Sequence, residues 1–182
     1  MEIVRTSIPG CLQLLLPVHE DERGLFVKTY QEEGFRNHGL VTEFAEEYYT
    51  VSRQHVLRGL HFQLPPQDHI KLVHCAEGMV LDAVLDLRIG SPTYGHHALV
   101  ELTSKKANLL YIPRGVAHGF LAMSEHAVML YKVTTSYSPQ HDTGIHWNSA
   151  GIPWPVKEPI VSSRDKGFAH LRDFRSPFTF SA

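Results

Sequence analysis

The chain has 182 residues, of which 43% are hydrophobic and 20% are charged, and its formal net charge is -2 at pH 7. This length fits one domain spanning residues 1–182, and the composition excludes a disordered chain and a membrane protein. The charge gives no electrostatic reason to expect nucleic-acid binding, and the first residues lack the apolar core of a signal peptide, so we expect a cytoplasmic protein. In that reducing compartment Cys11 and Cys75 are expected to be free buried thiols.

The first elements expected along the chain are a short helix and a hairpin. The helix is predicted over residues 30–38, and two strands over residues 71–76 and 79–87. Glu77-Gly78 between these strands suits a tight turn, because glycine accepts a positive φ. In the second strand apolar side chains at odd positions alternate with Asp82 and Asp86, which predicts a strand buried on one face only.

Turn signals then separate further short strands. Residues 90–95 and 104–108 break the chain between strands predicted over residues 96–102, 109–113 and 126–134, and residues from 160 onward are expected to pack as loop and helix. Many short strands at this spacing predict a mainly β protein with short peripheral helices, a sandwich or barrel of the jelly-roll type.

Several motifs spread over most of the chain resemble one known family. The most specific is the run Arg58-Gly59-Leu60-His61-Phe62-Gln63. The others, in the family's order, are the segments 21–24 (DERG), 71–73 (KLV), 90–93 (GSPT), 112–120 (IPRGVAHGF), 130–132 (LYK) and 162–165 (SSRD). On these motifs the sequence resembles the dTDP-4-dehydrorhamnose 3,5-epimerases.

The resemblance implies a cupin double-stranded β-helix jelly roll, usually a homodimer, that uses neither metal nor organic cofactor. The implied reaction inverts C3, or C3 and C5, of a nucleotide-diphosphate 4-keto-6-deoxyhexose in deoxysugar biosynthesis. A C–H beside a carbonyl is weakly acidic, so inversion needs a base on one face, a proton donor on the other and a group that holds the enolate.

The family's catalytic residues fall on four positions of this sequence. His61 matches the base, Asp165 the carboxylate that pairs with it, and Tyr131 the opposing acid. Lys71 matches a residue that helps to stabilise the enolate. Each of these side chains alone would have an ordinary structural explanation, and only the motifs around them favour catalysis.

Other positions are implied to bind substrate. Arg23 and Arg58 match residues that contact the diphosphate, for which a planar guanidinium is well suited. His118 matches a residue near the active site and is expected to support the substrate or the catalytic groups, and Gln63 is assigned to substrate binding within its motif.

Three departures from the family pattern concern the nucleotide. Lys28 stands where a Glu is typical, Glu46-Glu47-Tyr48 replaces Gln-x-Asn, and Ser136 removes one aromatic ring. Lysine only donates hydrogen bonds, so Lys28 with Glu46 suggests a CDP or GDP sugar in place of the dTDP sugar, with Tyr48 or Tyr49 stacking on the base. A plain salt bridge between Lys28 and Glu46 is the competing explanation.

The 13 histidines invite a metal hypothesis, but their spacing does not favour it. Metal-dependent cupins carry a His-x-His pair, whereas His61 is followed by Phe62 and Gln63, and neighbouring His96 and His97 would point to opposite faces of a strand. Two other functions stay open: a 3,4-ketoisomerase and a non-catalytic sugar-binding cupin.

Overall fold

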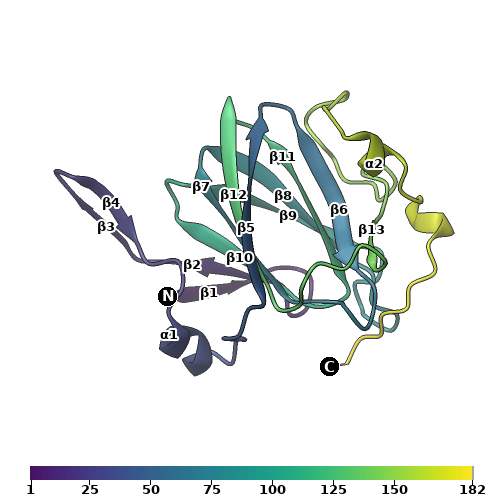
Figure 1. Cartoon of the computed structure of the whole chain (residues 1–182), viewed down its shortest axis with the longest axis horizontal. Coiled ribbons are helices and arrows are strands. Elements are labelled where there is room, and N and C mark those ends of the chain that lie inside the picture. The colour runs from purple at the N-terminus through teal and green to yellow at the C-terminus, as the bar shows by residue number, and fades with distance from the viewer. Residues whose placement is uncertain (182) are drawn as a thin grey trace.

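A computed structural model describes residues 1–181 of the chain. Two antiparallel sheets face each other in this structure (Figure 1). The six-stranded sheet runs in the order β1 (Glu2–Arg5), β2 (Leu12–Leu15), β10 (Asn108–Ile112), β7 (Lys71–Glu77), β12 (His126–Val133) and β5 (Glu46–Arg53). The five-stranded sheet runs in the order β13 (Asp142–Gly144), β6 (Leu57–Gln63), β11 (Val116–Ala122), β8 (Met79–Asp86) and β9 (His97–Thr103). The predicted mainly β, cupin-type jelly roll is confirmed.

The remaining elements lie outside this barrel. β3 (Val18–Asp21) and β4 (Gly24–Val27) form a hairpin that projects away from the sheets, and α1 (Glu32–Asn37) lies near the N-terminus (Figure 1). The C-terminal segment, with α2 (Ser163–Lys166) and the 3-10 helix Leu171–Asp173, runs beside β6 and β13. The predicted helix near residues 30–38 and the C-terminal loop with helix are therefore confirmed.

The hairpin predicted between residues 71–76 and 79–87 is wrong. β7 pairs with β10 and β12 in one sheet, whereas β8 pairs with β11 and β9 in the other. Gly78 does adopt a positive φ of 79°, and a Cβ atom there would lie 2.1 Å from the backbone oxygen of His126. The turn thus carries the chain from one sheet to the other, as closing a two-sheet barrel requires.

The prediction that this second strand is buried on one face only is also wrong, because β8 is covered on both faces. Val80 and Val84 belong to the cluster between the sheets, whereas Ala83 and Leu85 pack beneath the C-terminal residues Ile152 and Phe178. Both acidic side chains of the strand, at positions 82 and 86, are 0% exposed. Buried carboxylates need hydrogen-bonding partners, and both have them.

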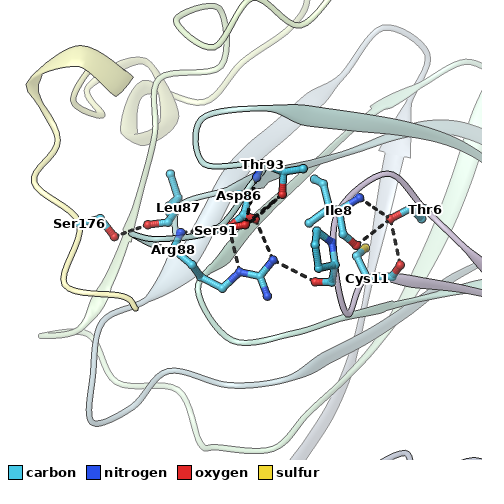
Figure 2. A network of polar contacts seen from close by, with 10 residues as sticks. Thr6, Ile8, Cys11, Asp86, Leu87, Arg88, Ser91, Thr93 and Ser176 are labelled. Carbon is cyan, nitrogen blue, oxygen red and sulfur yellow. Dashed lines mark hydrogen bonds and ion pairs between the residues drawn. The ribbon is translucent and has the colours of Figure 1, made fainter. Parts of the chain in front are cut away.

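Asp86 anchors a polar network at the end of β8 (Figure 2). Its carboxylate accepts hydrogen bonds from Nε and Nη2 of Arg88 at 2.8 Å each, from Oγ of Ser91 at 2.6 Å and from Oγ1 of Thr93 at 2.7 Å. Arg88 also donates to the backbone oxygen of Pro9 at 2.9 Å. Burial raises the pKa of Asp86, but these donors outweigh it and hold the pKa below its usual range. The segment Gly90-Ser91-Pro92-Thr93 therefore serves the fold, and not the cavity described below.

Cys11 and Cys75 are both buried and unpaired within the central cluster, as expected. Burial raises the pKa of the Cys11 thiol to about 12 and that of Cys75 to about 11. No helix among residues 1–181 is long and apolar enough to cross a membrane.

Candidate active site

A cavity of about 450 Å³ opens between the two sheets, within the size range of small-molecule sites. Strands β5, β7 and β12 of one sheet and β6 and β11 of the other contribute its walls. The predicted site residues that line it are Glu46, Tyr48, Arg58, His61, Gln63, Lys71, His118 and Tyr131. The predicted site residues between Glu46 and Tyr131, a span of 86 positions in the sequence, thus line one cavity.

His61 lies on β6 and is backed by Asp165 from α2. Nε2 of His61 lies 2.9 Å from Oδ1 of Asp165, at ion-pair distance. Oδ2 of Asp165 accepts from the backbone N–H of Gly59 at 2.9 Å, and Ser162 caps the helix by accepting from the Asp165 N–H at 3.1 Å. Burial raises the pKa of Asp165, but His61 and Gly59 outweigh it and lower the pKa overall. An ionised Asp165 can stabilise an imidazolium on His61.

Two glycines set the close approach of the strands beneath His61. A Cβ atom on Gly59 would lie 2.5 Å from Cα of Gly119 on the neighbouring strand, and Gly59 has a φ of 128°. A Cβ atom on Gly119 would lie 2.7 Å from the backbone oxygen of Arg58. The register of β11 and β6 shifts at this point, between His118 and Phe120. Glycine at both positions therefore lets β6 and β11 approach each other this closely.

Tyr131 reaches the cavity from β12 and is 5% exposed. Its hydroxyl lies 3.1 Å from Oγ1 of Thr50, and its ring stacks on Tyr48 with centroids 4.7 Å apart and planes inclined by 12°. Burial raises the pKa of Tyr131 above its usual value. The phenol is therefore protonated at neutral pH and can donate a proton.

Lys71 is a buried cation at the start of β7, with 7% of its surface exposed. Burial lowers its pKa to about 8, against the attraction of Asp82 and Asp142. The side chain still carries its charge at pH 7, where an ammonium can stabilise a developing oxyanion.

His118 forms a second histidine–carboxylate pair, with Asp82. Nε2 of His118 lies 2.7 Å from Oδ2 of Asp82, and neither side chain is more than 4% exposed. Burial raises the pKa of Asp82 and lowers that of His118. Asp82 fixes the orientation of the His118 ring, which lies opposite His61 in the pairing of β11 with β6. The sequence reasoning missed Asp82, because alternation alone placed it on an exposed face.

Arg58 and Gln63 line the cavity but are also tied to the protein. Nε of Arg58 donates to Oγ of Ser52 at 3.0 Å, which holds the guanidinium beside β5. The amide of Gln63 accepts from the backbone N–H of Ser138 at 2.6 Å and donates to the backbone oxygen of Gln67 at 2.8 Å. Gln63 therefore braces two loops at the cavity, and its predicted contact with substrate stays a prediction.

Two predicted binding residues lie away from the cavity of their own chain. Arg23, at the tip of the projecting hairpin, has a side chain 85% exposed and pairs with Asp21 at 2.5 Å. Lys28 lines a different hollow, beside Phe26 and Lys132. Glu46 accepts from the backbone N–H of Tyr137 at 2.9 Å. The salt bridge between Lys28 and Glu46, which was the competing explanation for these two residues, is therefore not among the ion pairs of residues 1–181.

Comparison with known proteins identifies the family. Residues 5–173 match the family described as dTDP-4-dehydrorhamnose 3,5-epimerase. The chain belongs to this family. A relative of that name from Salmonella typhimurium is 41% identical over 169 residues, which cover 91% of this chain and 92% of the relative.

Solved structures of epimerases share the fold. A dTDP-6-deoxy-D-glucose-3,5-epimerase from Legionella pneumophila, in complex with dTDP-4-keto-L-rhamnose, has a TM-score of 0.93 at 32% identity and covers 99% of both chains. A 3'-monoepimerase from Streptomyces bikiniensis, in complex with dTDP-quinovose, has a TM-score of 0.87 at 30% identity and covers 92% of this chain and 86% of that one. Like its relatives, this member of the dTDP-4-dehydrorhamnose 3,5-epimerase family is an isomerase.

In this epimerase-family chain, the cavity includes further residues that the sequence did not single out. They are Thr50, His69, Thr135, Tyr137, Asp142 and Arg164. Nη2 of Arg164, on α2, forms an ion pair with Oδ2 of Asp142, at the start of β13, at 2.6 Å. Tyr137 is 60% exposed at the cavity and follows Ser136, where the expected aromatic ring is missing. Within residues 1–181, no group of three or more His, Cys, Asp or Glu side chains is arranged to hold a metal ion.

Proposed function

We propose that this enzyme inverts C3, or C3 and C5, of a dTDP-linked 4-keto-6-deoxyhexose through an enolate, in deoxysugar biosynthesis. One observation carries the proposal: His61 and Tyr131 line a single cavity from facing sheets, β6 in one and β12 in the other. A base and an acid on opposite walls are what inversion beside a ketone requires.

His61 takes the proton from the carbon next to the carbonyl, and Asp165 stabilises the resulting imidazolium. The ammonium of Lys71 stabilises the enolate oxygen. His118, whose ring is oriented by Asp82, lines the same cavity and supports the bound sugar. Tyr131 returns a proton to the other face of the carbon. The lowered pKa of Asp165 supports an ionised carboxylate beside the imidazolium, and the raised pKa of Tyr131 supports a protonated hydroxyl that can act as the donor.

We favour dTDP as the carrier over CDP or GDP. The relatives' complexes with dTDP sugars support this choice. The alternative depended on Lys28 and Glu46 acting together, and Glu46 is instead engaged by the backbone of Tyr137. Calorimetric titration with dTDP, CDP, UDP and GDP tests the choice, and tighter binding of CDP or GDP would overturn it.

We infer a homodimer from the projecting hairpin. Leu25 and Phe26 on β4 are 53% and 61% exposed, and an exposed apolar hairpin favours a protein partner. Arg23 on the same hairpin would then reach a diphosphate only outside its own chain. Sedimentation equilibrium of the protein and of a Phe26→Asp variant tests this, and a wild-type monomer at micromolar concentration would contradict it.

Solvent exchange separates epimerisation from its alternatives. In deuterated water with a dTDP-4-keto-6-deoxyhexose, the protein should place deuterium at the inverted carbon, and His61→Asn should lower the rate by about 10²–10⁴-fold. A 3,4-ketoisomerase would instead move the carbonyl, and a sugar-binding cupin would leave the substrate unlabelled. Normal turnover by a folded His61→Asn protein would remove His61 as the base.

A further inference from the structure

Tyr131 is held on three sides. Tyr48 stacks on one face of its ring, Thr50 lies 3.1 Å from its hydroxyl, and the ring of His118 meets it edge-on at 6.2 Å and 71°. Tyr48 and Thr50 project from the same face of β5, whose register places Tyr48 opposite Tyr131. A single strand therefore supplies both the ring contact and the hydroxyl contact.

Tyr48 is not an ordinary core residue. It is 41% exposed and lines the cavity, whereas the ring that it covers is 5% exposed. Its neighbour Tyr49 is 68% exposed on the other face of the strand and does not line the cavity. The side of Tyr48 that faces away from Tyr131 is thus available to the bound sugar.

Because the Tyr131 hydroxyl is held in one position, it cannot reach both of the acidic C–H carbons beside the ketone equally well. C3 and C5 flank the carbonyl carbon of a 4-keto sugar on opposite sides, so one acid can serve both only if its hydroxyl or the sugar ring moves between two positions. Swinging Tyr131 would break its stack with Tyr48 and its contact with Thr50 together. The ring of Tyr48 also limits movement of the sugar on that side of the cavity.

Resting on the proposed epimerase activity, we propose that Tyr48 is a positioning residue for Tyr131 that confines proton delivery to one of the two carbons flanking the carbonyl. The enzyme then inverts mainly a single centre. The stacked ring carries this role, so phenylalanine at position 48 preserves it and a small side chain abolishes it.

The test compares inversion at C3 and at C5, followed by NMR in deuterated water with dTDP-4-keto-6-deoxyglucose. A carbon counts as labelled only where deuterium enters with inverted configuration, because His61 alone can exchange the proton without inversion. We expect the wild type to label one carbon at least about 10-fold faster than the other. Tyr48→Phe should keep that ratio, and Tyr48→Ala should lower it at least threefold. Thr50→Val, which removes the contact with the Tyr131 hydroxyl at nearly constant volume, should lower it as well. Val51→Ala, on the outer face of the same strand, is the control for disturbance of β5 and should keep the wild-type ratio.

The outcomes distinguish the two proposals. A wild type that labels neither carbon refutes the epimerase activity itself. Equal labelling of both carbons by the wild type leaves the activity standing and overturns the role of Tyr48. An unchanged ratio in folded Tyr48→Ala also overturns it, and Tyr48→Leu serves the same purpose if the alanine variant does not fold.

Discussion

Replacing Lys71 by methionine should raise the free energy of unfolding of the protein and lower its epimerase activity. The side chain is 7% exposed, and burial lowers its pKa from 10.5 to about 8. Each pKa unit corresponds to about 1.4 kcal/mol, so at pH 7 the buried ammonium costs the fold about 3 kcal/mol. Methionine removes the charge at similar length, so Lys71→Met should raise the free energy of unfolding by up to about that amount. This amount already includes the attraction of Asp82 and Asp142, which opposes the effect of burial on the pKa of Lys71.

The pH dependence of stability gives the sign of the effect. Between the folded pKa of about 8 and the unfolded value of 10.5, the unfolded chain binds more protons at Lys71 than the folded chain. Wild-type stability therefore rises with pH in this window, and the penalty is fully present below pH 8. The advantage of Lys71→Met should thus be largest at pH 7 and smaller by about 2 kcal/mol at pH 9.5.

Urea unfolding at both pH values measures the difference, and the slope with denaturant should be unchanged. Lys132→Met is the matched control, because Lys132 lies on the outer face of β12 and pairs with Glu47. Its effect should not change between the two pH values. If Lys71→Met were less stable than the wild type by the same margin at pH 7 and 9.5, the ammonium would be well satisfied and this reasoning refuted. Epimerase activity should fall by about 10²–10³-fold, as for loss of an oxyanion donor.

Three other substitutions test the site and the fold. Asp165→Asn should lower kcat by about 10²–10⁴-fold with little change in KM, because His61 loses the charge that stabilises its imidazolium; near-normal kcat would contradict the pairing. Tyr131→Phe should let solvent exchange outlast inversion, since His61 still removes the proton, and equal loss of both would assign Tyr131 to binding. Arg88→Ala should destabilise the fold by about 3–5 kcal/mol in urea unfolding, because it removes the cationic partner of the buried Asp86, to which the hydroxyls of Ser91 and Thr93 still donate. Arg36→Ala, at the exposed pair with Glu32, should stay within about 0.5 kcal/mol and is the control; equal effects would contradict the structural role of Arg88.

Part of the fold was predictable because local sequence carries it. The strands predicted over residues 71–76, 96–102, 109–113 and 126–134 follow from apolar runs bounded by turn residues, and they correspond to β7, β9, β10 and β12. Strands β6 and β11 were not predicted, because they carry Arg58, Gly59, His61, His118 and Gly119, which interrupt any alternation. In both strands the residues needed for the site obscure the pattern that would reveal the strand.

Pairing between distant segments was the part that local sequence does not encode. Glu77-Gly78 correctly signals a turn with positive φ, but nothing in the turn states whether the next strand returns to the same sheet. Asp82 looks like an exposed acid until His118, 36 residues away, is placed beside it. Likewise, motif matching gathers His61, Lys71 and Tyr131, but whether Arg23 and Lys28 join them depends on where the hairpin projects.

The base and the acid are positioned by separate parts of the chain. His61 depends on Asp165, which reaches it from α2 and binds the backbone of Gly59, a contact between residues 106 positions apart. Tyr131 depends on β5, through Tyr48 and Thr50. Because these supports share no residue, a change in the first should impair proton abstraction and a change in the second should impair proton delivery. Exchange and inversion therefore report on different regions of the fold, even though both occur in one cavity.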